Sequence, residues 1–99
     1  MTTEELVDAG FPTENWPEDL PMPGESNIGE AVSGTQKLFR YQTQADGRTF
    51  AMEVVVDLAT VPNPAEGVGF MLNQFAYLWR TNKDGIAVQP DGSCRRVNF

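Results

Sequence analysis

Few side chains in this 99-residue sequence have the chemistry of a catalytic or metal-binding site. The chain contains no histidine, the commonest general base and a frequent ligand of transition metals. Its single cysteine, Cys94, therefore has no histidine to activate it and no second thiol with which to bind zinc or form a disulfide. We expect Cys94 to be an unreactive, packed strand residue. The sequence predicts neither a cofactor nor a metal site.

Two carboxylates remain as candidates for acid–base chemistry. Glu53 and Asp57 fall on one face of a predicted strand, and they support a small hydrolase as the third and least favoured function. We expect Glu53 instead to pair with Arg40 on a solvated sheet face. The run from Gly67 to Gly69 lacks the third glycine of a dinucleotide-binding loop, and the chain has no phosphate-binding Gly-Lys-Ser/Thr sequence. The sequence therefore predicts a protein without enzymatic activity.

The elements that would position these residues begin with a β-hairpin. Apolar and polar residues alternate over residues 37–44 and 49–58, which is the period of half-buried strands. Asp46-Gly47 between them favours a type I′ turn, because that turn needs positive φ at both central residues. The turn fixes the register of the hairpin. The predicted pairs are Ala45–Arg48, Thr43–Phe50, Tyr41–Met52, Phe39–Val54, Arg40–Glu53 and Leu38–Val55.

A helix is predicted to follow the hairpin. Asn63 is a suitable N-cap, Pro64 fits the first helical position and Glu66 lies three residues after the cap. An apolar stripe at helical spacing continues to about residue 82. The glycines at 67 and 69 weaken the first turns, so we expect the helix to begin nearer Phe70.

Two short strands are predicted after the helix, at residues 86–89 and 93–99, on either side of a turn at Pro90-Asp91-Gly92. Residues 37–99 then form an α+β domain of two layers, with the order β-β-α-β-β. One helix packs on a mainly antiparallel sheet in this arrangement. An extended, proline-rich, acidic N-terminal arm, residues 1–36, precedes the domain.

This arm differs from the rest of the chain in charge and composition. It holds eight of the 14 acidic residues and none of the seven basic ones, in a chain whose net charge is −7. A short helix with Thr3 as N-cap and Gly10 at its end opens it. Four prolines between Phe11 and Gly24 exclude a long helix or a central strand, yet a solvated linker would lack the large apolar side chains found here. We expect the arm to bind protein surface through Phe11, Trp16, Leu20 and Met22.

Two more groups of residues suggest binding. Phe70 and Tyr77 lie seven residues apart, on the side of the helix away from its main apolar stripe. One sheet covers one helix face, so these aromatic residues meet either the chain's own arm or a partner. The last twenty residues gather cations of opposite sign to the arm. Either the arm docks on them, in its own domain or in a neighbouring copy, or they are scattered solubilising charges. These cations are Arg80, Lys83, Arg95 and Arg96.

Together these features predict a non-enzymatic protein–protein interaction or assembly subunit, an accessory or structural component of a larger complex or of a virion. Its partner would be another protein or a second copy. The alternative is an acidic inhibitor or decoy that binds a nucleic-acid-handling or other host enzyme. The negative charge argues against binding to nucleic acid or to a membrane, and the single cysteine favours the cytoplasm. The predicted partner-binding residues are Phe11, Trp16, Leu20, Met22, Phe70, Tyr77, Arg80, Arg95 and Arg96.

Overall fold

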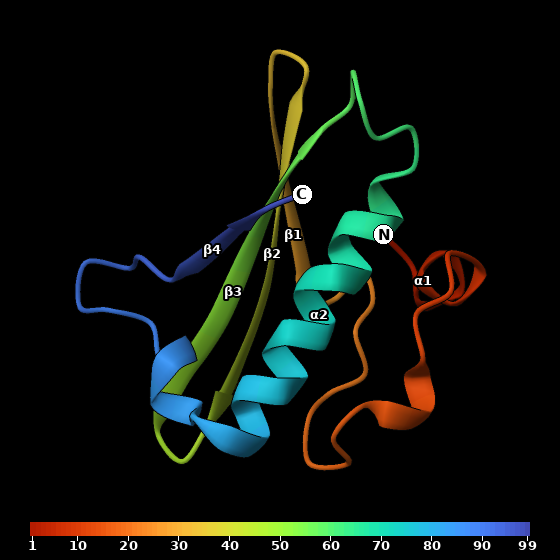
Figure 1. The fold of residues 1–99 in the computed structure, drawn as a ribbon. Helices are drawn as coiled ribbons and strands as arrows, with labels where there is room; N and C mark the ends of the chain where they lie inside the picture. The colour runs from red at the N-terminus through yellow and green to blue at the C-terminus, as the bar shows by residue number, and fades with distance from the viewer.

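Helix α2 (Pro64–Thr81) lies across one face of a four-stranded sheet in the computed structural model, which describes residues 1–99 (Figure 1). The strands follow one another across the sheet in chain order. They are β1 (Ile28–Ser33), β2 (Gln36–Ala45), β3 (Arg48–Asp57) and β4 (Arg95–Asn98). The first three are antiparallel neighbours and β4 is parallel to β3. The predicted α+β class, with one helix on a mainly antiparallel sheet, is confirmed.

The hairpin of β2 and β3 has the predicted register at every pair. Asp46 and Gly47 at its turn have φ of 55° and 73°, the positive values that a type I′ turn requires. Alternation along the two strands turns one set of side chains toward α2. This set forms the centre of the hydrophobic core and comprises Phe39, Tyr41, Phe50, Met52, Val54 and Val56.

Helix α2 begins at Pro64 and not near Phe70, which corrects the expected start. Asn63 Oδ1 accepts a hydrogen bond from the Ala65 N–H at 3.1 Å and so caps the first turn. Gly67 costs helix propensity but permits close packing: a Cβ there would lie 2.6 Å from Val56 Cγ2. Tertiary contact with β3 therefore outweighs the weak propensity of this turn.

The chain after α2 differs from the two predicted strands. Residues Lys83–Ile86 form a short 3-10 helix, and only Ala87 bridges to β3, at Phe50. The second predicted strand is confirmed only over β4, which pairs beside β3 in the parallel sense. Helix α2 supplies the crossover that two parallel neighbouring strands need, because a tight turn cannot join them.

Strand β1 lies within the segment that the sequence assigned to the arm. It pairs with β2 from Ile28–Tyr41 to Ser33–Gln36, through a turn in which Gly34 has φ of 61°. Only Ile28 of this strand is buried. The sheet therefore extends one strand further toward the N-terminus than predicted.

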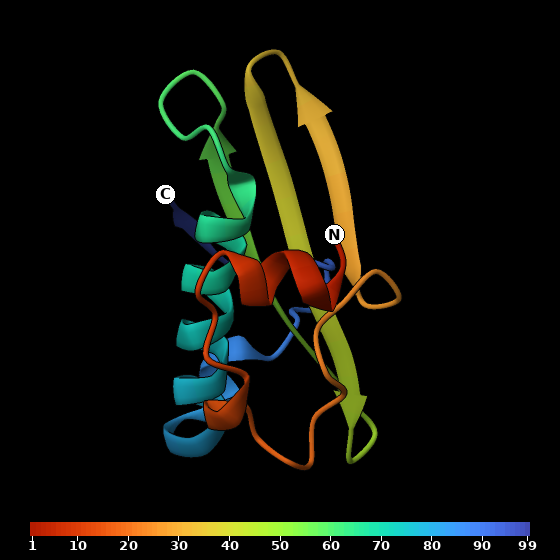
Figure 2. The ribbon, with the colours of Figure 1, turned by 90° about the vertical axis from the view of Figure 1, so that its right-hand side faces the viewer.

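The extended arm is not confirmed, because residues 1–24 fold against α2 (Figure 2). They contain helix α1 (Thr3–Asp8) and a short 3-10 helix at Thr13–Asn15. The N-cap of α1 is Thr2, one residue before the predicted Thr3, because Glu5 completes a capping box with Thr2. Residues 1–36 and 37–99 share one hydrophobic core. No helix combines the length and apolar character needed to cross a membrane.

Candidate protein-interaction surface

One face of α2 remains exposed while the other is buried in the core. Its exposed positions recur every three or four residues, so they form one stripe along the helix. We call this stripe the α2 outer face. It consists of Glu66, Phe70, Asn73, Gln74, Tyr77, Arg80 and Thr81.

Two aromatic side chains dominate the α2 outer face. Phe70 is 42% exposed and Tyr77 is 62% exposed, as expected for residues turned away from the sheet. They lie two helical turns apart, about 10 Å along the axis. The ring of Phe70 also contacts that of Phe99, with centroids 5.7 Å apart, and Phe99 itself is 42% exposed. The aromatic surface thus extends from the helix to the end of the chain.

The N-terminal segment flanks this face and leaves it open. The side chain of Phe11 comes within 3.8 Å of a Cβ placed at Gly69, and Ala9 and Gly10 line a shallow depression beside Phe70. Of the two alternatives left open by the sequence, the structure shows the segment docked on its own domain. The exposure of Phe70 and Tyr77 persists even so.

Opposite charges stand at the two ends of the α2 outer face. Glu66 lies in the first turn and Arg80 in the last. The ion pairs of the protein are Lys37–Glu30, Arg40–Glu53, Arg48–Asp84 and Arg96–Glu53, so neither end is paired with an opposite charge. The guanidinium of Arg80 does donate a hydrogen bond to the backbone oxygen of Asn15.

Three of the residues predicted to bind a partner are core residues in this fold. Phe11, Trp16 and Leu20 are each at most 7% exposed. Trp16 stacks on Phe75 with centroids 6.2 Å apart, and its Nε1 donates a hydrogen bond to the Pro21 oxygen at 3.1 Å. These anchors bind the chain's own helix, because burying large aromatic side chains there removes them from water. Met22, the fourth anchor, remains 48% exposed.

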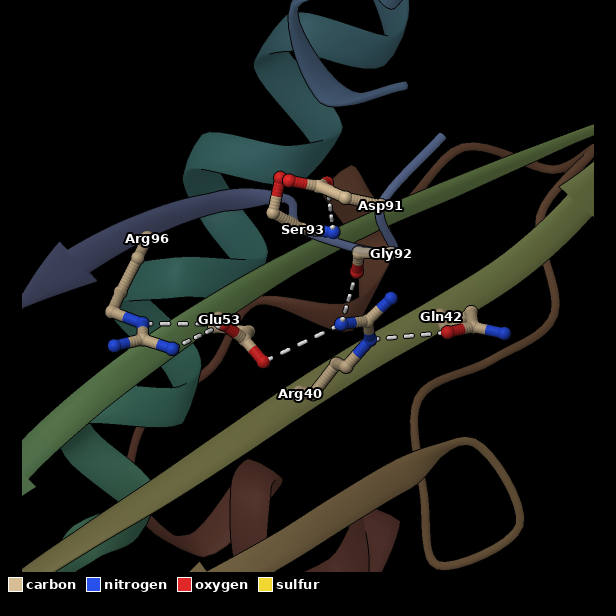
Figure 3. Close-up of polar contacts among 7 residues, drawn as sticks. All are labelled: Arg40, Gln42, Glu53, Asp91, Gly92, Ser93 and Arg96. Carbon is tan, nitrogen blue, oxygen red and sulfur yellow. Dashed lines mark hydrogen bonds and ion pairs between the residues drawn. The ribbon is translucent and has the colours of Figure 1, made fainter. Parts of the chain in front are cut away.

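Arg95 and Arg96 do not join the α2 outer face, because they lie on β4. Arg96 belongs to a polar cluster on the sheet face away from α2 (Figure 3). Glu53 accepts hydrogen bonds there from Arg96 Nε and Nη2 at 3.2 and 3.0 Å, and from Arg40 Nη1 at 3.5 Å. The predicted pair of Arg40 and Glu53 is confirmed. The expected solvated setting is wrong, since two guanidinium groups leave Glu53 only 8% exposed.

Glu53 and Asp57, the two carboxylates considered for acid–base chemistry, lie far apart along β3. Four residues along a strand place Glu53 and Asp57 about 13 Å apart, too far for a pair that acts on one bond. Asp57 accepts a hydrogen bond from the Ala59 N–H at 3.0 Å and closes the turn after β3. No group of three or more cysteine or carboxylate side chains is placed to hold a metal ion.

Cys94 lies half-buried beside Glu53 and Arg40. Burial, together with the negative charge of Glu53, raises the pKa of the Cys94 thiol. A nucleophilic cysteine needs the opposite shift, because only the thiolate attacks. The environment of Cys94 thus keeps the thiol protonated.

Sequence reasoning missed two residues that bear on the α2 outer face. Alternation along residues 95–99 places Phe99 on the same side of its strand as Val97, which packs against the core, so the pattern contained the signal. Glu66 was assigned only to the start of the helix. Its exposure at the end of an aromatic stripe depends on how α2 is rotated against the sheet.

Comparison with known proteins leaves the α2 outer face to be interpreted from its own geometry. No family model matches the chain, no protein with a curated description is detectably similar to it, and no solved structure matches its fold. The function is therefore inferred from the contacts, exposure and charges of the residues described above.

Proposed function

We propose that this protein is a non-enzymatic assembly subunit that binds another protein through the α2 outer face. The observation that carries the proposal is the exposure of Phe70 and Tyr77, at 42% and 62%, on a helix whose opposite face is buried. Complete burial of such a side chain is worth about 1.5–3 kcal/mol. Tyrosine and phenylalanine are enriched at the centres of protein interfaces, where they carry much of the binding energy.

The polar surroundings of these two residues also suit an interface. Asn73 and Gln74 lie between them on the helix, while Glu66 and Arg80 stand at the ends. Interfaces of non-obligate complexes combine an apolar centre with such a polar rim. The amide side chains offer both donors and acceptors to a partner.

The α2 outer face is held in place before any partner arrives. The core stripe of the helix packs on the sheet, and the N-terminal segment braces one flank through Phe11 at Gly69 and Asp19 at Trp79. A preorganised surface loses little conformational freedom on binding. We propose that this complex forms in the cytoplasm or in a virion, since a single cysteine suits a reducing compartment.

The test places a photoactivatable phenylalanine analogue at position 77, in place of Tyr77. A control variant carries the analogue at position 42, in place of Gln42, which is exposed on the sheet face away from α2. Adducts are analysed both in the purified protein and in an extract of the native source. We expect a defined protein adduct from position 77 that the additional substitution Phe70→Ser abolishes, and none from position 42. Equal adducts from both positions, or none from position 77 in either setting, would contradict the proposal.

The acidic-decoy alternative depends on the carboxylates of residues 1–36 facing a partner. Three of these bond within the chain, Glu5 to Thr2, Asp19 to Trp79 and Glu30 to Lys37. A salt series separates the alternatives, because a charge-driven decoy loses affinity steeply as salt screens its contacts. We expect the adduct from position 77 to persist at about 0.5 M salt, since aromatic burial is not weakened by screening.

A further inference from the structure

We infer that the partner of the α2 outer face is a second copy of this chain, whose α2 lies antiparallel to the first across a twofold axis. This inference rests on the proposed function and gives that function a partner. A twofold interface is isologous, so each residue must suit whatever residue the symmetry places opposite it. The α2 outer face meets this requirement along its length.

The residues of the α2 outer face are arranged symmetrically about a point between Asn73 and Gln74. Phe70 and Tyr77 stand at equal distances on either side of that point. In an antiparallel pair, Phe70 therefore meets Tyr77 of the second copy, and Tyr77 meets Phe70 of the second copy. Adjacent helix residues point about 100° apart, so Asn73 and Gln74 flank the two aromatic residues on opposite sides. The twofold axis brings each of them against the same residue of the second copy, and the paired amide side chains can exchange hydrogen bonds.

The two charged ends of the α2 outer face follow the same symmetry. Glu66 in the first turn comes beside Arg80 of the second copy, which is one residue away from the position directly opposite Glu66. The twofold axis repeats this contact at the other end of the helix pair. Neither side chain has an oppositely charged partner within its own chain. The antiparallel arrangement also brings the positive end of each helix dipole toward the negative end of the other.

The charge of the α2 outer face is compatible with self-association of this acidic protein. Each copy carries a charge of −7, so two copies repel one another over most of their surface. The α2 outer face holds one acid and one base, and its charge is therefore zero. It is a neutral, aromatic surface on an acidic molecule, so the charges of the face itself do not oppose the approach of a second copy.

The experiment exchanges the charges at the two ends. Glu66→Arg alone sets arginine against arginine at both ends of the pair, and Arg80→Glu alone sets glutamate against glutamate. Each single variant is expected to raise the dimer dissociation constant about tenfold, measured by sedimentation equilibrium at low salt. An equimolar mixture of the two variants restores both contacts, as does the double variant Glu66→Arg/Arg80→Glu.

Restoration in the mixture is the readout that a merely structural effect would not give. Thermal unfolding of each variant checks that the monomer remains folded, since Arg80→Glu also removes the hydrogen bond to Asn15. Tyr77→Ser, which removes one of the two aromatic side chains of the face, is expected to give a monomer, while Gln42→Ser leaves the dimer unchanged. Singles that weaken the dimer without restoration in the mixture would overturn the antiparallel arrangement.

The failure of this inference is distinguishable from that of the proposed function. A purified protein that is monomeric up to about millimolar concentration, with a specific adduct at position 77 in the native extract, overturns self-association and leaves a different protein as the partner. A dimer that neither Tyr77→Ser nor the charge substitutions affect uses another surface and overturns the inference as well. A monomer with no adduct refutes both proposals.

Discussion

The indole Nε1 of Trp79 donates hydrogen bonds to both carboxylate oxygens of Asp19, at 3.2 and 3.1 Å, across 60 residues of sequence. The same indole stacks on Phe75, with centroids 6.2 Å apart, and carries the ammonium of Lys83 4.0 Å from its ring centroid. This one side chain therefore joins the N-terminal segment to the last turns of α2. The acidic residue expected to seek a basic partner binds an aromatic donor of its own domain.

Replacing Asp19 by alanine should destabilise the protein by about 1–3 kcal/mol, because the hydrogen bond has a charged acceptor and its donor is partly buried. The free energy of unfolding measured in urea reports the loss. Glu18→Ala is the matched control, since the neighbouring carboxylate makes no hydrogen bond or ion pair. Equal effects of the two substitutions would show that Asp19 does not fasten the segment.

Trp16→Ala should cost about 3–5 kcal/mol, since it leaves a cavity between Phe11, Tyr41 and Phe75. Met22→Ala, at the exposed end of the same segment, should stay within about 0.5 kcal/mol of the parent. Urea unfolding of the purified protein measures both. A Trp16 variant as stable as the Met22 variant would mean that the segment does not pack on its own domain in solution.

The stability of the protein should fall at high pH because of Tyr41. Burial raises the pKa of this phenol from its usual 10 to about 12, and the hydroxyl donates a hydrogen bond to the Pro21 oxygen at 3.0 Å. Between these values the folded protein keeps a proton that the unfolded chain loses. The contribution of the protonated Tyr41 phenol to the free energy of unfolding is therefore complete below pH 10. It disappears as the pH rises through 12, which lowers the free energy of unfolding by about 2–3 kcal/mol.

Urea unfolding at pH 9 and pH 12 tests this prediction, with Tyr41→Phe as the comparison. The variant is expected to be about 1 kcal/mol less stable at pH 9, because it lacks the hydrogen bond to Pro21. It should lose less stability than the parent between the two pH values. Parallel losses in the two proteins would assign the alkaline sensitivity to other groups.

Cys94 should react slowly with iodoacetamide at pH 8, because burial and the charge of Glu53 raise the pKa of its thiol. The rate should increase only as the pH approaches that raised value. Glu53→Gln removes one cause of the shift and leaves Arg40 and Arg96, whose charges lower the pKa, so it should speed the reaction. Glu30→Gln, which removes a carboxylate from a surface ion pair with Lys37, is the control and should leave the rate unchanged.

The parts of the fold that the sequence predicted correctly depend on local signals. Asp46-Gly47 allows one tight turn, and the turn determines that Arg40 stands opposite Glu53. The Asn63-Pro64 start of α2 is equally local. The outward position of Phe70 and Tyr77 also followed from helical period alone, because the opposite stripe is more strongly apolar.

The parts that were missed depend on tertiary contacts. Ile28 is the only buried residue of β1, so that strand lacks the alternation by which strands are recognised. The prolines around Trp16 show that the chain there is neither helix nor central strand, but they say nothing of where the indole docks. The second guanidinium on Glu53 comes from Arg96, 43 residues away, and requires the parallel placement of β4.

The docking of residues 1–24 on α2 has a consequence for synthesis on the ribosome. The segment emerges before α2, and the helix that covers Phe11 and Trp16 is completed only at Thr81. Through most of translation the nascent chain must therefore carry two uncovered aromatic residues, the kind of transient exposure that attracts chaperones or invites aggregation. Residues 1–24 therefore reach these native contacts only after α2 has been made.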